Sequence, residues 1–310
     1  MSSKTERQTT DKLLMVSPDQ FGFNPETATT NSFQNKLDID EIKVRDEALK
    51  EFTEVVEVLS SHDIEVIVLP SRQDFVTPDA VFPNNWVSFH DNGLMVLYPM
   101  LNENRQAERQ QNNLRNTLAQ VDIVFDDTLD LSSDENEGKI LEGTGSVVLD
   151  RVNRVAYAME SPRTNKDEFT KYCQAIGFEP VFFHAYDKDN LPIYHTNVIM
   201  SVGEDFAVIC QEAVKDDDEA IAVLKMLNAT GKDVIEITLE QVYQFCGNIL
   251  QVSNKFGDKK IIMSQKAYNG FTEEQRNTLS KNGEIVTVNI PTIETVGGGS
   301  ARCMLAEVFA

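Results

Sequence analysis

The sequence predicts an α/β protein built as a closed ring of five similar units. Each unit contains two strands, a helix and a third strand, and the same order of apolar and turn residues returns along the chain. Equivalent positions lie 58, 53, 51 and 57 residues apart, at residues 84, 142, 195, 246 and 303. Because four such intervals are hard to obtain by chance, we interpret them as an internal repeat.

Three consecutive units show the repeat most clearly. Their predicted strands fall at residues 146–149, 155–158 and 180–183, then 197–201, 206–210 and 234–237, then 248–252, 259–263 and 284–288. The first helix has apolar residues from Phe169 to Ile176 on one face and ends at Gly177. The second runs through Leu224 and ends near Gly231, and the third begins at Thr272 with a capping box.

The remaining two units are less regular. The earlier one has predicted strands at 86–89, 94–98 and 122–125 and a polar helix over 102–119. The other is divided between the chain ends, with strands at 304–309, 13–16 and 65–69 and a helix over 39–59. Pairing of the two ends closes the ring and surrounds a central axis with the first strands. We therefore expect one catalytic domain over residues 12–310, preceded by a flexible tail over residues 1–11.

Composition limits the classes of partner. Of the 310 residues, 41% are hydrophobic and 25% are charged, which is enough to bury a large core. The chain carries 28 Lys and Arg against 50 Asp and Glu, a formal net charge of −22. Such a surface repels phosphate backbones and anionic lipids, so we expect neither nucleic acid nor a membrane as a partner.

The sequence also bears on compartment and cysteine chemistry. It has no long apolar run and begins with polar residues, so we expect a cytoplasmic protein. A homo-oligomer is compatible with the sequence. The four cysteines are widely spaced and predict neither a disulfide framework nor a zinc site: Cys173, Cys210, Cys246 and Cys303. Each is either buried packing or a reactive thiol.

Unusual polar residues gather where the first strands of four units begin. The segments are 82–86 (Phe-Pro-Asn-Asn-Trp), 141–145 (Leu-Glu-Gly-Thr-Gly), 194–197 (Tyr-His-Thr-Asn) and 297–303 (Gly-Gly-Gly-Ser-Ala-Arg-Cys). In a closed ring they meet at one cavity. There, Cys303, His195 and Glu142 suffice for covalent thiolate catalysis, with His195 setting the protonation of the thiol and Glu142 orienting the centre.

Each of these residues has an alternative explanation when taken alone. Cys303 could be buried packing, His195 a hydrogen-bonded core residue and Glu142 a turn residue. Their recurrence at the same phase of the repeat favours a shared site. The Gly-x-Gly after Glu142 lacks the third glycine of a dinucleotide fingerprint, so we expect no nucleotide cofactor.

These motifs, in this order and spacing, resemble the guanidino-group-modifying enzymes of the pentein fold, a five-bladed α/β-propeller. Arginine deiminase, dimethylarginine dimethylaminohydrolase and the amidinotransferases belong to it. The resemblance covers nearly the whole chain after the first ten residues. Phe-Pro-Asn-Asn-Trp, together with Ser-Pro-Arg-Thr-Asn at residues 161–165, is most similar to the citrulline-utilising hydrolase branch called CtlX.

The resemblance implies roles for the three central residues. Cys303 is the expected nucleophile, His195 the general acid and base, and Glu142 a carboxylate that binds the nitrogen-bearing head of the substrate. The thiolate attacks the planar carbon of this head, and His195 protonates the leaving amine and then activates water. The expected partner is a small amino-acid substrate, and neither a cofactor nor a metal is required.

The resemblance also implies how the ends of the substrate are bound. Arg163, which follows Glu-Ser-Pro at the expected start of a helix, is the arginine that holds the substrate α-carboxylate. A solvated arginine at a helix start is the alternative. Arg105 or Arg109 is expected to share this task, and Phe82 to contact the substrate.

One departure from the family pattern concerns the charge of the substrate. In arginine deiminases the motif at Asn84 and Asn85 normally ends in Asp, and the motif at His195 normally reads His-x-Asp, where this chain has Asn197. Carboxylates suit a guanidinium cation, whereas an amide can also donate to a carbonyl oxygen. We therefore expect these three asparagines to bind a neutral ureido group.

Together these observations predict hydrolysis of citrulline, or a close analogue, to ornithine, CO2 and ammonia through a covalent cysteine intermediate. The enzymatic alternative is an arginine deiminase or amidinotransferase that acts on a guanidino substrate. A non-enzymatic alternative is a ribosome-binding factor of the same fold, which lacks the Cys, His and Glu set. That set and the acidic charge both disfavour the alternative.

Overall fold

The structure is a computed structural model that describes residues 6–310, and it contains five three-stranded sheets, as predicted. In every sheet the middle strand is antiparallel to one neighbour and parallel to the other. The blades are β3 (Val87–Phe89), β4 (Leu94–Leu97) and β5 (Asp127–Asp130); β6 (Val147–Asp150), β7 (Val155–Met159) and β8 (Glu179–Phe183); β9 (Met200–Val202), β10 (Phe206–Ile209) and β11 (Asp233–Glu236); β12 (Leu250–Ser253), β13 (Lys259–Ser264) and β14 (Glu284–Val288); and β15 (Ala306–Glu307), β1 (Lys12–Val16) and β2 (Glu65–Leu69).

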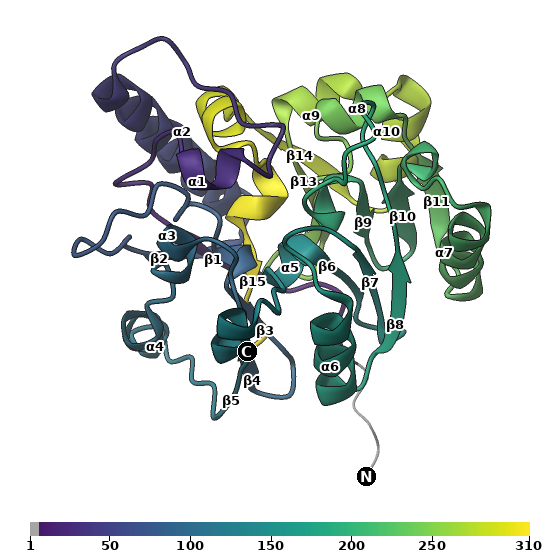
Figure 1. Cartoon of the computed structure of the whole chain (residues 1–310), viewed down its shortest axis with the longest axis horizontal. Helices are drawn as coiled ribbons and strands as arrows, with labels where there is room; N and C mark the ends of the chain where they lie inside the picture. Colours follow the sequence, from purple (N-terminus) through teal and green to yellow (C-terminus); the bar gives the residue numbers. More distant parts are fainter. Residues whose placement is uncertain (1–5) are drawn as a thin grey trace.

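The longer helices lie around the outside of this ring of sheets (Figure 1). The longer ones are α2 (Glu41–Ser61), α4 (Gln111–Ala119), α6 (Lys166–Ile176), α7 (Asp217–Ala229) and α10 (Glu273–Ser280), and the shorter ones are α1 (Pro25–Ala28), α3 (Glu103–Gln106), α5 (Gly143–Ser146), α8 (Leu239–Tyr243) and α9 (Gln265–Gly270). Helix α10 begins at the predicted capping box of Thr272 and Gln275. Helix α6 ends at Gly177, whose φ of +71° is accessible to glycine at little cost.

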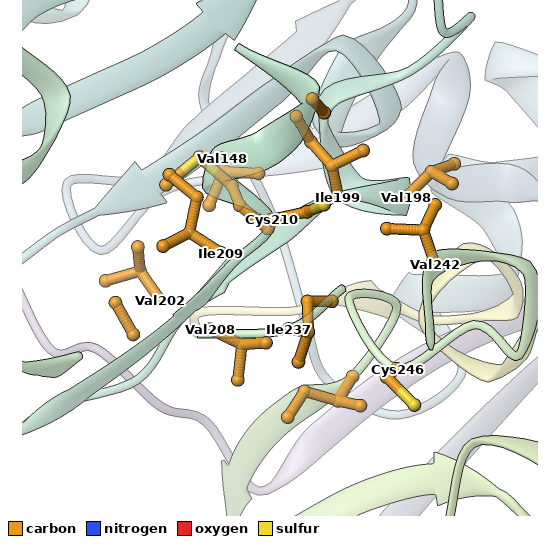
Figure 2. Close-up of a cluster of buried hydrophobic side chains, with 14 of the residues drawn as sticks. Val148, Val198, Ile199, Val202, Val208, Ile209, Cys210, Ile237, Val242 and Cys246 are labelled. Atoms are coloured by element: carbon orange, nitrogen blue, oxygen red, sulfur yellow. The ribbon is translucent and has the colours of Figure 1, made fainter. Parts of the chain in front are cut away.

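Apolar side chains fill the space between neighbouring blades. Figure 2 shows one such cluster, to which Val148 of β6, Val202 of β9, and Val208 and Ile209 of β10 contribute. All four are buried, because the first and second strands of a blade are covered on both faces. This packing holds the first strands around the axis, where their leading segments form the functional site.

The two ends of the chain close the ring, as predicted. Strand β15 pairs antiparallel with β1, with Leu13 opposite Glu307 and Leu14 opposite Ala306. Strand β15 also lies beside β3 of the next blade, and β9 lies beside both β6 and β12. Since Cys303 precedes β15 by three positions, ring closure places this residue at the axis.

The segment before β1 differs from the flexible tail that we expected. Gln8 and Thr10 are buried, and Gln8 Nε2 donates to the carbonyl oxygens of Leu149 and Val202 at 3.0 and 3.1 Å. Thr10 Oγ1 donates to the carbonyl of Val308 at 2.6 Å. Residues 6–11 are therefore packed into the fold, because their polar side chains satisfy backbone groups of the inner strands. Residues 1–5 of the predicted tail lie outside the described residues.

The prediction of a strand at 122–125 was wrong. The third strand of that blade is β5, whose residues alternate less clearly between apolar and polar types. In the predicted segment, Ile123 and Phe125 pack with Leu114 and Leu118 of α4, and Val124 is 69% exposed. The alternating pattern therefore reflects a loop that covers α4 rather than a paired strand.

The polar helix predicted over 102–119 is divided into α3 and α4. Between them the chain leaves the helical path, and Arg109 Nη1 donates to the carbonyl of Tyr98 at 3.2 Å. The first part of the segment has no apolar face, so tertiary contacts of its arginines decide its conformation. One consequence is that Arg105 of α3 points into the protein and is buried.

Candidate active site

The leading segments of the first strands meet at one cavity. Six of the predicted site residues line it: Phe82, Asn85, Arg105, Arg163, His195 and Cys303. Five further residues complete the wall: Asn31, Asp79, Tyr194, Gly297 and Gly299. The other three predicted residues, Asn84, Glu142 and Asn197, are buried near the cavity without lining it.

Glycines allow the segments to approach each other. Gly143 has a φ of +47°, and a β-carbon there would lie 2.3 Å from the carbonyl oxygen of Asn84. A β-carbon at Gly145 would lie 2.3 Å from Asn85 Nδ2 and 2.8 Å from the ring of His195. The Glu-Gly-x-Gly motif is thus explained by close contact between three blades and not by a nucleotide.

His195 and Glu142 form a buried pair. His195 Nε2 lies 2.9 Å from Glu142 Oε2, and the backbone N–H of Leu101 donates to Glu142 Oε1 at 3.1 Å. Burial opposes ionisation of Glu142, but Arg163, His195 and Arg105 outweigh it and lower the pKa of Glu142 to about 2. Burial lowers the pKa of His195 to about 4, against the raising effect of Glu142.

Both shifts favour a carboxylate beside a neutral imidazole at neutral pH. A carboxylate can only accept, so Nε2 of His195 carries the proton and Nδ1 is the free acceptor. Glu142 therefore orients His195. His195 and Arg163 separate Glu142 from the cavity, and its side chain does not line the cavity wall. This differs from the prediction that Glu142 binds the head of the substrate.

The sulfur of Cys303 is enclosed by amides. Asn248 Nδ2 lies 3.3 Å from Sγ and Asn197 Nδ2 lies 3.7 Å from it. Burial raises the pKa of Cys303, although these amides and Arg302 act in the opposite direction. Burial also favours the neutral form of His195, so the resting centre is a thiol beside a neutral imidazole.

Arg163 is buried, so the alternative of a solvated arginine is wrong. It lies in the turn before α6, which begins at Lys166. Its Nη2 donates to the carbonyl of Thr27 at 3.0 Å and to Thr30 Oγ1 at 2.9 Å, and its Nη1 lies 3.5 Å from Glu142 Oε2. Arg163 thus joins the wall of the cavity to the His195–Glu142 pair.

Arg105 also lines the cavity. Its guanidinium is paired in a bidentate manner with Glu108, at 2.7 and 2.9 Å. Nη1 also donates to Asn85 Oδ1 at 3.1 Å, and Nη2 donates to the carbonyl of Phe82 at 3.2 Å. The neighbouring carboxylates raise the pKa of Arg105 further despite burial, so it is a permanent cation at the cavity.

The sequence reasoning missed Asp79. It lies on the cavity wall and is 2% exposed, with Oδ2 accepting from Asn24 Nδ2 at 2.7 Å and Thr27 Oγ1 at 2.9 Å. Its Oδ1 has no hydrogen-bond partner among the described residues. Burial raises the pKa of Asp79, and Arg105 and Arg163 act against that. The position three residues before Phe82 was the only sequence signal.

Tyr194 was also missed as a wall residue, although it begins a quoted motif. Its ring centroid lies 4.7 Å from that of His195 and 5.1 Å from the guanidinium carbon of Arg163. Its hydroxyl donates to the carbonyl of Gly298 at 2.6 Å. Tyr194 thereby fixes the glycine segment against His195.

The described residues contain no group of three or more His, Cys, Asp and Glu side chains able to hold a metal ion. Within residues 6–310, no helix is sufficiently long and apolar to cross a membrane.

Comparison with known sequences identifies the family. A family profile described as N,N dimethylarginine dimethylhydrolase, eukaryotic, matches residues 17–310. The chain belongs to this dimethylarginine dimethylhydrolase family. A further relative is the uncharacterized protein YkgA of Bacillus subtilis, strain 168, which is 26% identical over 302 residues, covering 97% of this chain and 92% of YkgA.

Solved structures show that this family member has the fold that we predicted. The N-terminal domain of ArgZ, an arginine dihydrolase from the ornithine-ammonia cycle in cyanobacteria, is 15% identical with a TM-score of 0.73 and covers 96% of this chain and 99% of that domain. A dimethylarginine dimethylaminohydrolase solved as an adduct with S-methyl-L-thiocitrulline has a TM-score of 0.65 at 15% identity, covering 96% and 99%. The pentein fold is therefore confirmed.

Proposed function

We propose that the chain hydrolyses the ureido group of citrulline, or a close analogue, to ornithine, CO2 and ammonia through a covalent intermediate on Cys303. This assigns it to the citrulline-utilising branch of its superfamily. The family membership supports a hydrolase of guanidino-like compounds, and the choice of a ureido substrate rests on the cavity itself.

The observation that carries the proposal is the orientation of Asn85. Its Oδ1 accepts from Arg105, and because an arginine can only donate, this contact fixes the amide and leaves Nδ2 as a donor. Nδ2 has no hydrogen-bond partner among the described residues. A ureido carbonyl oxygen would satisfy this donor. A guanidinium offers only donors, so it would leave Nδ2 unpaired and buried, which is costly.

The charges around the cavity support the same substrate. Glu142 and Glu108 are already paired with arginines, which leaves Asp79 as the acid with a free oxygen on the wall. An amino acid has an α-ammonium for Asp79 and an α-carboxylate for Arg105 or Arg163. Once Asp79 is used, a guanidinium head would be buried without a matched anion, whereas a ureido head carries no charge.

The resting protonation states support a simple proton path. Neutral His195 accepts the Cys303 proton at Nδ1 as the sulfur attacks the ureido carbon, and Glu142 stabilises the imidazolium that forms. The C–N bond then breaks, and the leaving nitrogen takes this proton. Water, deprotonated by His195, cleaves the carbon–sulfur bond and restores the thiol, and the resulting carbamate decomposes to CO2 and an amine.

The test is a side-by-side assay of citrulline, arginine and N,N-dimethylarginine, in which ornithine, citrulline, ammonia and dimethylamine are measured. We expect ornithine from citrulline and negligible conversion of the two guanidino substrates. Cys303→Ser is the inactive control. Faster consumption of arginine than of citrulline would contradict the proposal and favour the arginine-type alternative that ArgZ represents.

A matched variant tests the role of the amide. Asn85→Asp keeps the acceptor for Arg105 and replaces the free donor by a carboxylate oxygen. We expect it to lower kcat/KM for citrulline and to raise the relative rate with arginine. An unchanged ratio between the two substrates would show that Asn85 does not select the head group.

A further inference from the structure

Asn248 touches the proposed nucleophile from a blade that contributed no predicted site residue. It lies between α8 and β12 and is fully buried. The preceding Gly247 lets this segment approach the neighbouring blade, because a β-carbon there would lie 2.3 Å from the carbonyl oxygen of Val198. The position of Asn248 at the axis is thus built into the fold.

Two backbone contacts fix the orientation of the Asn248 amide. Oδ1 accepts from the backbone N–H of Arg302 at 3.1 Å, and Nδ2 donates to the backbone carbonyl of Asn197 at 2.9 Å. An N–H can only donate and a carbonyl can only accept, so the amide cannot be exchanged end for end. The second hydrogen of Nδ2 remains available for Cys303 Sγ, 3.3 Å away.

The same amide serves both protonation states of the thiol. Cys303 Sγ lies 3.6 Å from Asn248 Oδ1, where a thiol hydrogen can be donated, and 3.3 Å from Nδ2, where a thiolate can accept. Among the described residues, the other side-chain nitrogen near the sulfur is Nδ2 of Asn197, at 3.7 Å. A buried thiolate needs such donors, because water does not replace them.

We propose that Asn248 is a catalytic residue, whose Nδ2 donates to Cys303 Sγ and stabilises the thiolate that attacks the substrate. The proposal rests on the proposed function in taking Cys303 as the nucleophile, and it holds for any electrophilic head that the cavity accepts. The fixed amide is pre-oriented, so no reorganisation is needed when the thiol loses its proton.

The first test measures the thiolate without any substrate. The rate of Cys303 alkylation by iodoacetamide is followed against pH by peptide mapping, together with the ultraviolet absorbance of the thiolate. Asn248→Asp keeps an acceptor for Arg302 but turns an oxygen toward the sulfur. We expect the alkylation rate at pH 8 to fall by about 10- to 100-fold, the range of a hydrogen bond to a charged group, and the pKa of Cys303 to rise.

Two further variants make the result decisive. Asn248→Ala removes the donor without adding charge, and it should slow alkylation in the same direction. Asn254→Asp makes the Asp substitution at a buried amide in the β12–β13 turn of the same blade and should leave the pH profile of Cys303 unchanged. Far-ultraviolet circular dichroism selects the folded variants, and the result with either folded Asn248 variant decides the question.

An unchanged profile in a folded Asn248 variant would overturn the proposal. This outcome is separable from failure of the proposed function. If the wild type ignores citrulline but Asn248→Asp still slows alkylation of Cys303, the substrate is wrong and the role of Asn248 stands. If citrulline is hydrolysed and alkylation is unaffected, the substrate is right and the role of Asn248 is refuted.

Discussion

Replacement of Asp79 by asparagine tests how the cavity recognises an amino acid. The carboxylate oxygen Oδ2 of Asp79 already accepts from Asn24 and Thr27, and the new amide oxygen can keep these bonds. The group that changes is the unpartnered Oδ1, which becomes an NH2 directed at the site of the substrate ammonium. Asp79→Asn therefore removes one charge with little change in shape.

The size of the effect follows from the buried setting. Two unit charges about 4 Å apart attract by about 4 kcal/mol at an effective dielectric constant of about 20. Solvation of the free ammonium returns part of this, so we expect a loss of about 2–4 kcal/mol, or about 30- to 1,000-fold in kcat/KM. Because burial raises the pKa of Asp79, the neutral amide should not lower the free energy of unfolding.

The assay compares citrulline with 5-ureidopentanoate, which lacks the α-amino group. The wild type should prefer citrulline strongly, and Asp79→Asn should lose this preference because its activity falls only with citrulline. Asp91→Asn, at a carboxylate that pairs with Arg7 away from the cavity, is the control. Equal losses with both substrates, or a large loss of stability, would refute the assignment of Asp79 to the ammonium.

Three other predictions concern titration and charge at the same site. Iodoacetamide should label Cys303 before the other three cysteines, whose pKa burial raises to about 12, and the rate should still increase above pH 9; peptide mapping that finds another cysteine labelled first would contradict this. The pKa of His195 is 6.5 in the unfolded chain and about 4 in the folded protein, so the unfolded state binds a proton first as the pH falls. We therefore expect the free energy of unfolding to decrease by about 3 kcal/mol between pH 6.5 and pH 4. Urea unfolding at these two pH values should show a smaller decrease in His195→Gln. Arg163→Ala should raise KM and also lower Tm, because it removes a cation that lowers the pKa of buried Glu142; an unchanged Tm would show that their 3.5 Å contact contributes little.

The architecture could be predicted from the sequence because each blade repeats the same local physics. The helix that ends at Gly177 and the capping box at Thr272 are set by short segments, and the structure confirms both. The failures lie in the blade of β3, β4 and β5. There the alternating residues 122–125 cover α4, while Asp127–Asp130 forms the strand through backbone bonds to β4.

The site could be predicted where reactive or polar side chains occupy equivalent positions in successive units of the repeat. Cys303, His195 and Asn85 were found in this way and meet at the cavity. Asp79 could not be found, because its role arises from contacts between blades that no local pattern records. Asn248 was overlooked, although it lies 51 residues after Asn197 and therefore at the same phase of the repeat. The protonation states also depend on tertiary contacts, because burial of both thiol and imidazole favours their neutral forms.

Closure of the ring has a consequence for how activity is lost. The pairing of β15 with β1 joins segments that lie nearly three hundred residues apart in the sequence, and contacts of such long range form slowly. Strand β15 itself has only two residues. Cys303 lies just before that strand, so the proposed nucleophile is positioned by the shortest strand pairing of the ring. We therefore expect mild denaturation to abolish activity while four blades keep their secondary structure. Turnover should then detect opening of the ring at a lower denaturant concentration than a spectroscopic signal from the sheets.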